Sequence, residues 1–185
     1  MKTACTALLL IFASFSSLAN GSNAKKAQSH SLGIKLGHSE LSAGKYTAAD
    51  GEGILQGLYY GYQLDSNWSL VLSAESADNM DCALVCGGGI IEPQASYESY
   101  AFSVKGQLPL SHKFSLFGKL GANYYETELA NSEQGIRQNT GVGALYAVGA
   151  DYQFSDNFVI GLESSWLEMD ELKSTNFGIS FQYRL

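Results

Sequence analysis

Charged residues are scarce in this sequence of 185 residues, and after its first residues no long apolar run replaces them. Only 16% of the residues are charged, well below the quarter that is usual in soluble domains, while 45% are hydrophobic. The mean hydropathy is nevertheless close to zero, at -0.05. This combination is typical of a chain in which apolar and polar residues alternate. The net charge of -7 argues against nucleic-acid binding, because an acidic surface repels phosphate backbones.

The apolar run at the start of the chain lies within MKTACTALLLIFASFSSLAN. Lys2 precedes a short apolar core, and small residues occupy the positions that a signal peptidase reads. We therefore predict a secretory signal at 1–19 that is cleaved. A transmembrane anchor is the alternative, but the apolar run is short for a span. The polar stretch 20–29 predicts a disordered periplasmic lead-in, which leaves one domain at 30–185.

Cysteine is nearly absent, with three residues in the chain. Cys5 lies in the predicted signal, so an exported chain keeps only Cys82 and Cys86. An even pair of cysteines in an oxidising compartment predicts a disulfide between them, with two free thiols as the alternative. No histidine is close to the pair in the sequence, so a metal site is not expected there.

Alternation of apolar and polar residues recurs from residue 32 to the last residue and predicts about eight strands. No helical pattern separates these segments, so sequential strands are expected to pair antiparallel. The apolar positions are, in chain order, Leu32, Ile34 and Leu36; Leu58, Tyr60, Tyr62 and Leu64; Trp68, Leu70, Leu72 and Ala74; Tyr100, Phe102 and Val104; Phe114, Leu116, Leu120 and Tyr124; Val142, Ala144, Tyr146, Val148, Ala150, Tyr152 and Phe154; Phe158, Ile160, Leu162 and Trp166; and Phe177, Ile179, Phe181, Tyr183 and Leu185.

The connections between the predicted strands alternate in length. Three are tight turns of Asp, Asn, Ser and Pro, at 65–67, 109–113 and 155–157. The longer stretches are 39–53, 77–95, 126–139 and 168–174. Short turns at one end and long loops at the other are typical of outer-membrane barrels. We therefore predict an all-β fold: a closed antiparallel up-and-down transmembrane barrel with short periplasmic turns and long extracellular loops.

The opposite parity of each strand is rich in glycine and other small residues. A face in water does not need glycine, whereas the interior of a small barrel has little room, so this parity is predicted to face the lumen. Its charges are nearly balanced in sign and lie on different strands. They predict a paired network, because an unpaired charge in a narrow interior is costly. The predicted network comprises Lys35, Glu75, Lys105, Lys119, Asp151, Glu163 and Arg184.

Aromatic residues on the apolar parity gather near both ends of the strands and predict the two aromatic girdles of a membrane barrel. The predicted girdle residues are Tyr62, Trp68 and Phe158 near the short turns, and Tyr100, Tyr124 and Trp166 near the long loops. The alternative is a soluble barrel of the lipocalin type, with the apolar parity inward. Such a barrel would bury aromatic side chains from every strand and leave a glycine-rich face in water.

Three segments carry a resemblance to a known family: GLYYGYQLDSNWSL, FSLFGKLGANYYE and ALYAVGADYQFSDNFVIGLE. Over residues 31–185 the chain resembles the OmpA/OmpX-like outer-membrane β-barrels of Gram-negative bacteria. The last segment, NFGISFQYRL, is similar to the terminal strand that the barrel-assembly machinery reads. Gly178, Phe181 and Tyr183 match its pattern, and Leu185 stands where such chains usually end in Phe. The resemblance implies an outer-membrane location among lipid and lipopolysaccharide, and the assembly machinery as a partner during biogenesis.

The function is expected to be non-enzymatic. Small barrels of the lipid A deacylase type use a His-x-Ser pair on a strand, and none of His30, His38 and His112 has a serine two residues later. We expect no cofactor, no metal and no nucleic acid, and a monomer that contributes to membrane integrity and contacts a host or phage ligand through its loops. The alternatives are a lipid A-modifying enzyme and a narrow pore, although about eight strands leave an interior that side chains fill.

Overall fold

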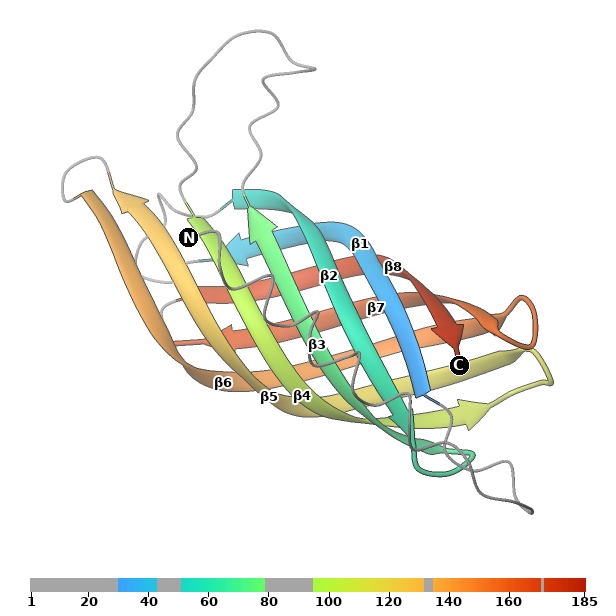
Figure 1. Cartoon of the computed structure of the whole chain (residues 1–185). Coiled ribbons are helices and arrows are strands. Elements are labelled where there is room, and N and C mark those ends of the chain that lie inside the picture. Colours follow the sequence, from blue (N-terminus) through green and yellow to red (C-terminus); the bar gives the residue numbers. More distant parts are fainter. Residues whose placement is uncertain (1–29, 43–50, 79–94, 132–134, 171) are drawn as a thin grey trace, which may run out of the picture.

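The computed structural model describes residues 30–42, 51–78, 95–131, 135–170 and 172–185. The described residues form a tilted barrel of strands (Figure 1). Within them, no helix is long and apolar enough to cross a membrane. The predicted signal, the lead-in and both cysteines of the predicted disulfide lie outside the described residues.

Each strand of the barrel pairs antiparallel with the strands before and after it, and β1 pairs with β8. The strands are β1 (His30–Ser42), β2 (Gly51–Gln63), β3 (Trp68–Asp78), β4 (Ala95–Pro109), β5 (Phe114–Asn131), β6 (Gly135–Gln153), β7 (Phe158–Met169) and β8 (Leu172–Arg184). The closing ladder runs from Ser31 opposite Arg184 to Ser42 opposite Lys173. At its end the Leu185 N–H donates to the His30 carbonyl at 2.8 Å. The predicted closed up-and-down barrel of eight strands is confirmed.

The two parities of each strand lie in different surroundings, because successive side chains of a strand point to opposite faces of the sheet. In β1, Lys35 points into the barrel and is 3% exposed, whereas its neighbour Leu36 points outward and is 51% exposed. In the other strands, too, large apolar side chains point outward, while the inward side chains are serine, asparagine, charged residues and a cluster of apolar residues at one end. The alternative of a barrel with the apolar parity inward is therefore wrong.

Glycines on the inner parity make room for the few large side chains of the lumen. Gly33 lies directly opposite Tyr59 on β2, and Gly149 lies directly opposite Phe117 on β5. A Cβ atom on either glycine would collide with the ring of its partner. Each aromatic ring thus covers a glycine across the ladder, which explains why an eight-stranded interior holds both residue types.

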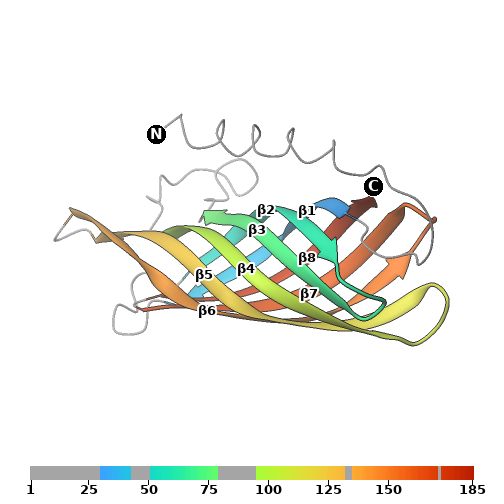
Figure 2. The ribbon, with the colours of Figure 1, turned by 60° about the horizontal axis from the view of Figure 1, so that its bottom comes forward.

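The three short turns share one construction. In each, an Asp or Ser side chain accepts a hydrogen bond from the backbone N–H three residues later, where an aromatic residue begins the next strand. The pairs are Asp65 with Trp68 at 2.9 Å, Ser111 with Phe114 at 3.1 Å and Ser155 with Phe158 at 3.2 Å. Such local bonds are the reason why Asp and Ser favour turns. Figures 1 and 2 place all three turns at the same end of the barrel.

The stretch 126–139, expected as a long loop, is mostly strand. β5 and β6 stay paired from Phe114 opposite Tyr152 to Asn131 opposite Gly135, so only 132–134 separates them. Polar cross-strand contacts support this extension, including a bond of 2.6 Å from Gln138 Nε2 to Glu128 Oε1. The stretch shows no apolar parity in the sequence, although Thr127 points inward and is buried.

Candidate functional site

The most distinctive group of side chains lies inside the barrel and comes from six different strands. The six are Lys35 on β1, Glu75 on β3, Lys105 on β4, Lys119 on β5, Asp151 on β6 and Glu163 on β7. No side chain among them is more than 12% exposed. Three positive charges face three negative charges, so this lumen network is neutral as a whole, which a narrow interior requires.

Four members of the lumen network form a continuous chain across the barrel. Lys35 Nζ lies 2.6 Å from Glu75 Oε1 and 3.0 Å from Glu163 Oε1. The second oxygen of Glu163 accepts a hydrogen bond from Lys119 Nζ. Glu163 therefore binds two lysines, and Lys35 joins two carboxylates.

The other two members form a separate pair. Lys105 Nζ lies 2.5 Å from Asp151 Oδ2, and Gln107 Nε2 donates to the same oxygen at 2.8 Å. Lys105 Nζ also lies 4.0 Å from the centre of the Phe117 ring, a favourable cation–π arrangement. Lys105 stands directly opposite Lys119 across β4 and β5. Like charges in that position repel, and each lysine is instead paired with an anion on β6 or β7.

Arg184, the seventh predicted member, is not brought into contact with the other six. Its Nη1 donates to Gln153 Oε1 at 3.3 Å, beside the short turn between β6 and β7. Arg184 and Lys105 instead line one polar cavity of about 30 Å³ at this end of the lumen, together with Ser31, Gln63, Gln107, Asp151 and Gln182 among others. The polar part of the lumen thus lies toward the short turns.

The other end of the lumen holds a cluster of buried apolar side chains, which we call the apolar cap, beside the hydrogen-bonded Ser39, Ser174 and Asn176. It consists of Leu41, Leu55, Ala77, Tyr97, Ala101, Tyr125, Leu145, Leu167, Met169 and Leu172, all buried. Tyr97 reaches from β4 to the far wall, where its hydroxyl accepts a hydrogen bond of 2.8 Å from Asn176 Nδ2 on β8. Sequence reasoning missed the cap, although continuing the inner parity of β7 from Glu163 leads directly to Leu167 and Met169.

The predicted girdle residues all belong to the outward parity. Trp68, Tyr100, Tyr124, Phe158 and Trp166 are exposed, and Tyr62 is half-buried. In the segment that resembles an assembly signal, Phe181, Tyr183 and Leu185 point outward. Gly178 points inward, where a Cβ atom would lie 3.2 Å from Lys35 Cγ. This glycine therefore leaves space for the lysine stem of the lumen network.

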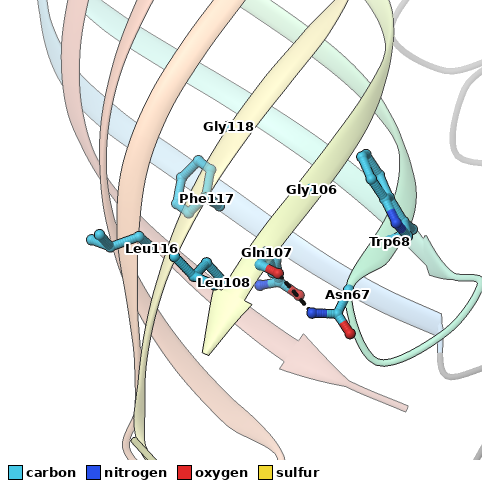
Figure 3. A pocket seen from close by; sticks show the side chains of 8 residues that line it. All are labelled: Asn67, Trp68, Gly106, Gln107, Leu108, Leu116, Phe117 and Gly118. Carbon is cyan, nitrogen blue, oxygen red and sulfur yellow. Dashed lines mark hydrogen bonds between the residues drawn. The ribbon is translucent and has the colours of Figure 1, made fainter. Parts of the chain in front are cut away.

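A hollow of about 420 Å³ lies on the outer surface near the short turns (Figure 3). Gly106 and Gly118 stand directly opposite each other on β4 and β5 and contribute no side chains to the outer surface, and the Trp68 ring lies over Gly106. The lining residues are Asn67, Trp68, Gly106, Gln107, Leu108, Leu116, Phe117 and Gly118. Asn67 Nδ2 donates to the Gln107 carbonyl at 3.0 Å and fixes the turn at the edge of the hollow.

The three histidines lie apart from the lumen network. His30 Nδ1 is 2.5 Å from the Tyr60 hydroxyl beside the first residues of β1. The His38 side chain is half exposed and lies 3.9 Å from Glu52, and His112 is exposed in a short turn. Among the residues that the structure describes, no three His, Cys, Asp or Glu side chains gather in a way that could hold a metal ion.

Comparisons with known proteins agree with this architecture. A family described as "outer membrane protein beta-barrel domain" matches residues 5–184. Ail, the attachment invasion locus protein of Yersinia pestis, superposes with a TM-score of 0.60 at 18% identity, over 86% of this chain and 99% of that chain. Neisserial surface protein A gives a TM-score of 0.62 at 9% identity, over 84% and 97% of the two chains.

A further solved structure with the same fold is the N-terminal barrel domain of OprF from Pseudomonas aeruginosa. Its TM-score is 0.56 at 14% identity, over 84% of this chain and 99% of that domain. At these identities the likeness concerns the fold alone. No curated protein sequence matches the chain.

Proposed function

Given that the chain belongs to the outer membrane protein beta-barrel domain family, we propose that it is a non-enzymatic surface protein. Its filled barrel contributes to membrane integrity, and its protruding strands contact a partner outside the cell. The lipid and lipopolysaccharide of the outer membrane surround the barrel, and the barrel-assembly machinery inserts it. The observation that carries the proposal is the length of the β5–β6 hairpin.

The β5–β6 hairpin extends beyond the rest of the barrel. β5 has 18 residues and β6 has 19, whereas β3 has 11 and β7 has 12. A tilted strand of 18 residues rises about 45 Å, well beyond the apolar band of an outer-membrane barrel, which is about 25 Å tall. Figures 1 and 2 both show this hairpin reaching past β7 and β8 at the end opposite the short turns.

One edge of the hairpin has no neighbouring strand among the described residues, and we infer that it takes up a partner. β6 pairs with β7 only from Leu145 opposite Leu167 to Gln153 opposite Val159. Among the described strands, residues 138–142 of β6 therefore pair with β5 alone. A strand edge of this kind can take up an extended peptide as an additional strand, with its backbone as the source of affinity. Ail, which has the same fold, is named for attachment and invasion, and this supports an adhesive role.

Shortening the hairpin is expected to abolish adhesion. The variant joins Tyr125 to Gly141, which stand opposite each other, through an Asn-Gly turn, so the barrel wall and the apolar cap are kept. Bacteria that express the full-length chain should adhere to cultured host cells better than bacteria with an empty vector, and the shortened variant should lose this gain. Heated and unheated gel mobility of outer-membrane fractions controls for folding. Equal adhesion by both proteins, or none by the full-length chain, contradicts the proposal.

A narrow pore is the second candidate, because the lumen is polar and holds a cavity toward the short turns. The apolar cap opposes it, since an apolar constriction is a barrier to ions. We expect the full chain to be silent in planar bilayers and a Leu55→Ser, Tyr97→Ala variant to conduct. Leu58→Ser, which changes an outward leucine of β2, is the control and should remain silent. Conductance of the unaltered chain that changes with Lys119→Met would favour the pore.

A further inference from the structure

We propose that the lumen contains a bound-water site between β3, β4 and β5, made by Glu75 Oε2, Ser99 Oγ and the side-chain amide of Asn123. Neither the family nor the proposed surface role assigns such a site. All four polar atoms are buried and have no hydrogen-bond partner among the described residues. The Glu75 side chain is 8% exposed, Ser99 is 2% exposed and Asn123 is 1% exposed.

The three residues are neighbours on the inner wall of the barrel. Glu75 stands directly opposite Ser99 across β3 and β4. Asn123 stands opposite Ala101 across β4 and β5, which places it diagonally from Ser99 on the same face. Directly opposed side chains begin about 5 Å apart and diagonal ones about 7–8 Å apart. These separations suit polar groups that are bridged by one or two small molecules.

On the side toward the short turns, the wall beside the three residues leaves space for such a molecule. The inward positions there carry only small side chains, because Ser73 faces Ala101 and Ser103 faces Gly121. A Cβ atom on Gly121 would lie 2.6 Å from Ser103 Cβ, so this position cannot hold a larger residue without rearrangement. On the other side the buried Tyr125, which stands opposite Ser99, closes the space.

The chemistry of the four atoms selects water as the ligand. The carboxylate oxygen and the Asn123 carbonyl oxygen need donors, the Asn123 Nδ2 needs an acceptor, and Ser99 Oγ can serve as either. Water donates and accepts, and a buried water typically makes about three hydrogen bonds. A metal cation would satisfy the oxygens but would be repelled by Nδ2. Lys35 Nζ, at 2.6 Å, already neutralises Glu75.

The bound water has a structural task in the lumen network. Lys35 holds one carboxylate oxygen of Glu75, and water holds the other, so the carboxylate is fixed at both oxygens. Without the water, a buried carboxylate oxygen and a buried amide would each remain unpaired, which costs roughly as much as a lost hydrogen bond per group. The site therefore stabilises the first link of the chain from Glu75 through Lys35 to Glu163.

The direct test is nuclear magnetic resonance on the whole chain in lipid nanodiscs. We expect nuclear Overhauser cross-peaks between water and the side-chain amide of Asn123. Their sign should be the one that indicates a water residence time longer than nanoseconds. The exposed side-chain amide of Gln138, which donates to Glu128, is the control and should report only short-lived water. Ser99→Ala removes one partner and should weaken the Asn123 cross-peaks. Absence of these cross-peaks in the unaltered chain overturns the proposal.

A substitution gives an independent readout. Asn123→Leu keeps a side chain of similar size and removes the hydrogen bonds that Asn123 makes to the water, so the urea midpoint of unfolding should fall. If Asn123 were unpaired, the same change would remove a buried unsatisfied amide and leave the midpoint unchanged or raise it. Ala122→Leu, at the adjacent outward position of β5, is the control and should not lower the midpoint. A midpoint that is unchanged or raised for Asn123→Leu overturns the proposal.

Discussion

Glu163→Gln is expected to lower the free energy of unfolding by about 3–5 kcal/mol, the usual cost of breaking a buried ion pair from one side. Glu163 accepts hydrogen bonds from Lys35 at 3.0 Å and from Lys119. After the substitution Lys35 keeps Glu75, but Lys119 remains charged, only 12% exposed and without a nearby anion of its own. Urea unfolding in lipid vesicles, followed by tryptophan fluorescence, measures the loss.

The matched control is Glu98→Gln, which makes the same chemical change on the outward parity of β4. Glu98 is exposed and stands directly opposite Glu126, so removing one of two like charges should cost nothing or stabilise slightly. Adding Lys119→Met to Glu163→Gln should recover part of the loss, because the unpaired charge disappears. If Glu163→Gln costs no more than Glu98→Gln, the lumen network does not stabilise the barrel.

Leu120→Arg is expected to cost about 2–4 kcal/mol, the penalty for arginine at mid-depth on the lipid face of a barrel. Leu120 lies in the middle of the membrane part of β5, between Val104 and Tyr146 on the adjacent strands, and is 62% exposed on the outer surface. When the variant folds, the charge of the arginine moves from water into hydrocarbon, which is unfavourable. The same vesicle unfolding experiment measures the effect.

Depth along the same strand supplies the control for this prediction. Leu116 points outward like Leu120 but lies two residues from the first residue of β5, next to a short turn. Leu116→Arg should therefore cost only about 0–1 kcal/mol, as expected near the interface. If Leu120→Arg leaves unfolding unchanged, the outward parity does not face hydrocarbon.

Strict period-two alternation made the fold predictable from sequence. A membrane barrel presents lipid to one parity and a narrow lumen to the other, so Lys35 and Leu36 differ in surroundings although they are adjacent. The same alternation predicted which charged residues point into the lumen. It could not predict their partners, because Lys35 and Glu163 are 128 positions apart and the alignment of β1 with β7 depends on how the barrel closes.

Alternation fails as a signal where the two parities become alike or exchange their character. Residues 126–139 are mostly polar at both parities, so this stretch resembled a loop. In the apolar cap the parities exchange: Leu167 and Met169 point inward, whereas Glu168 between them points outward and is exposed, so the outward apolar pattern of β7 ends at Trp166. The extension of β7 to Met169 follows from packing against Leu172 and its neighbours, which only the closed barrel brings together.

The seam between β1 and β8 has a consequence for chain topology. Leu185 and His30 meet at one rim through a hydrogen bond of 2.8 Å, so they could be joined and the chain opened at another short turn. Such a circular permutation would keep every rung of the ladder. It would also place the segment with Gly178, Phe181 and Tyr183 in the interior of the sequence. If the assembly machinery reads that segment, as its resemblance to an assembly signal implies, the permuted chain should still fold into lipid in vitro but lose insertion in cells.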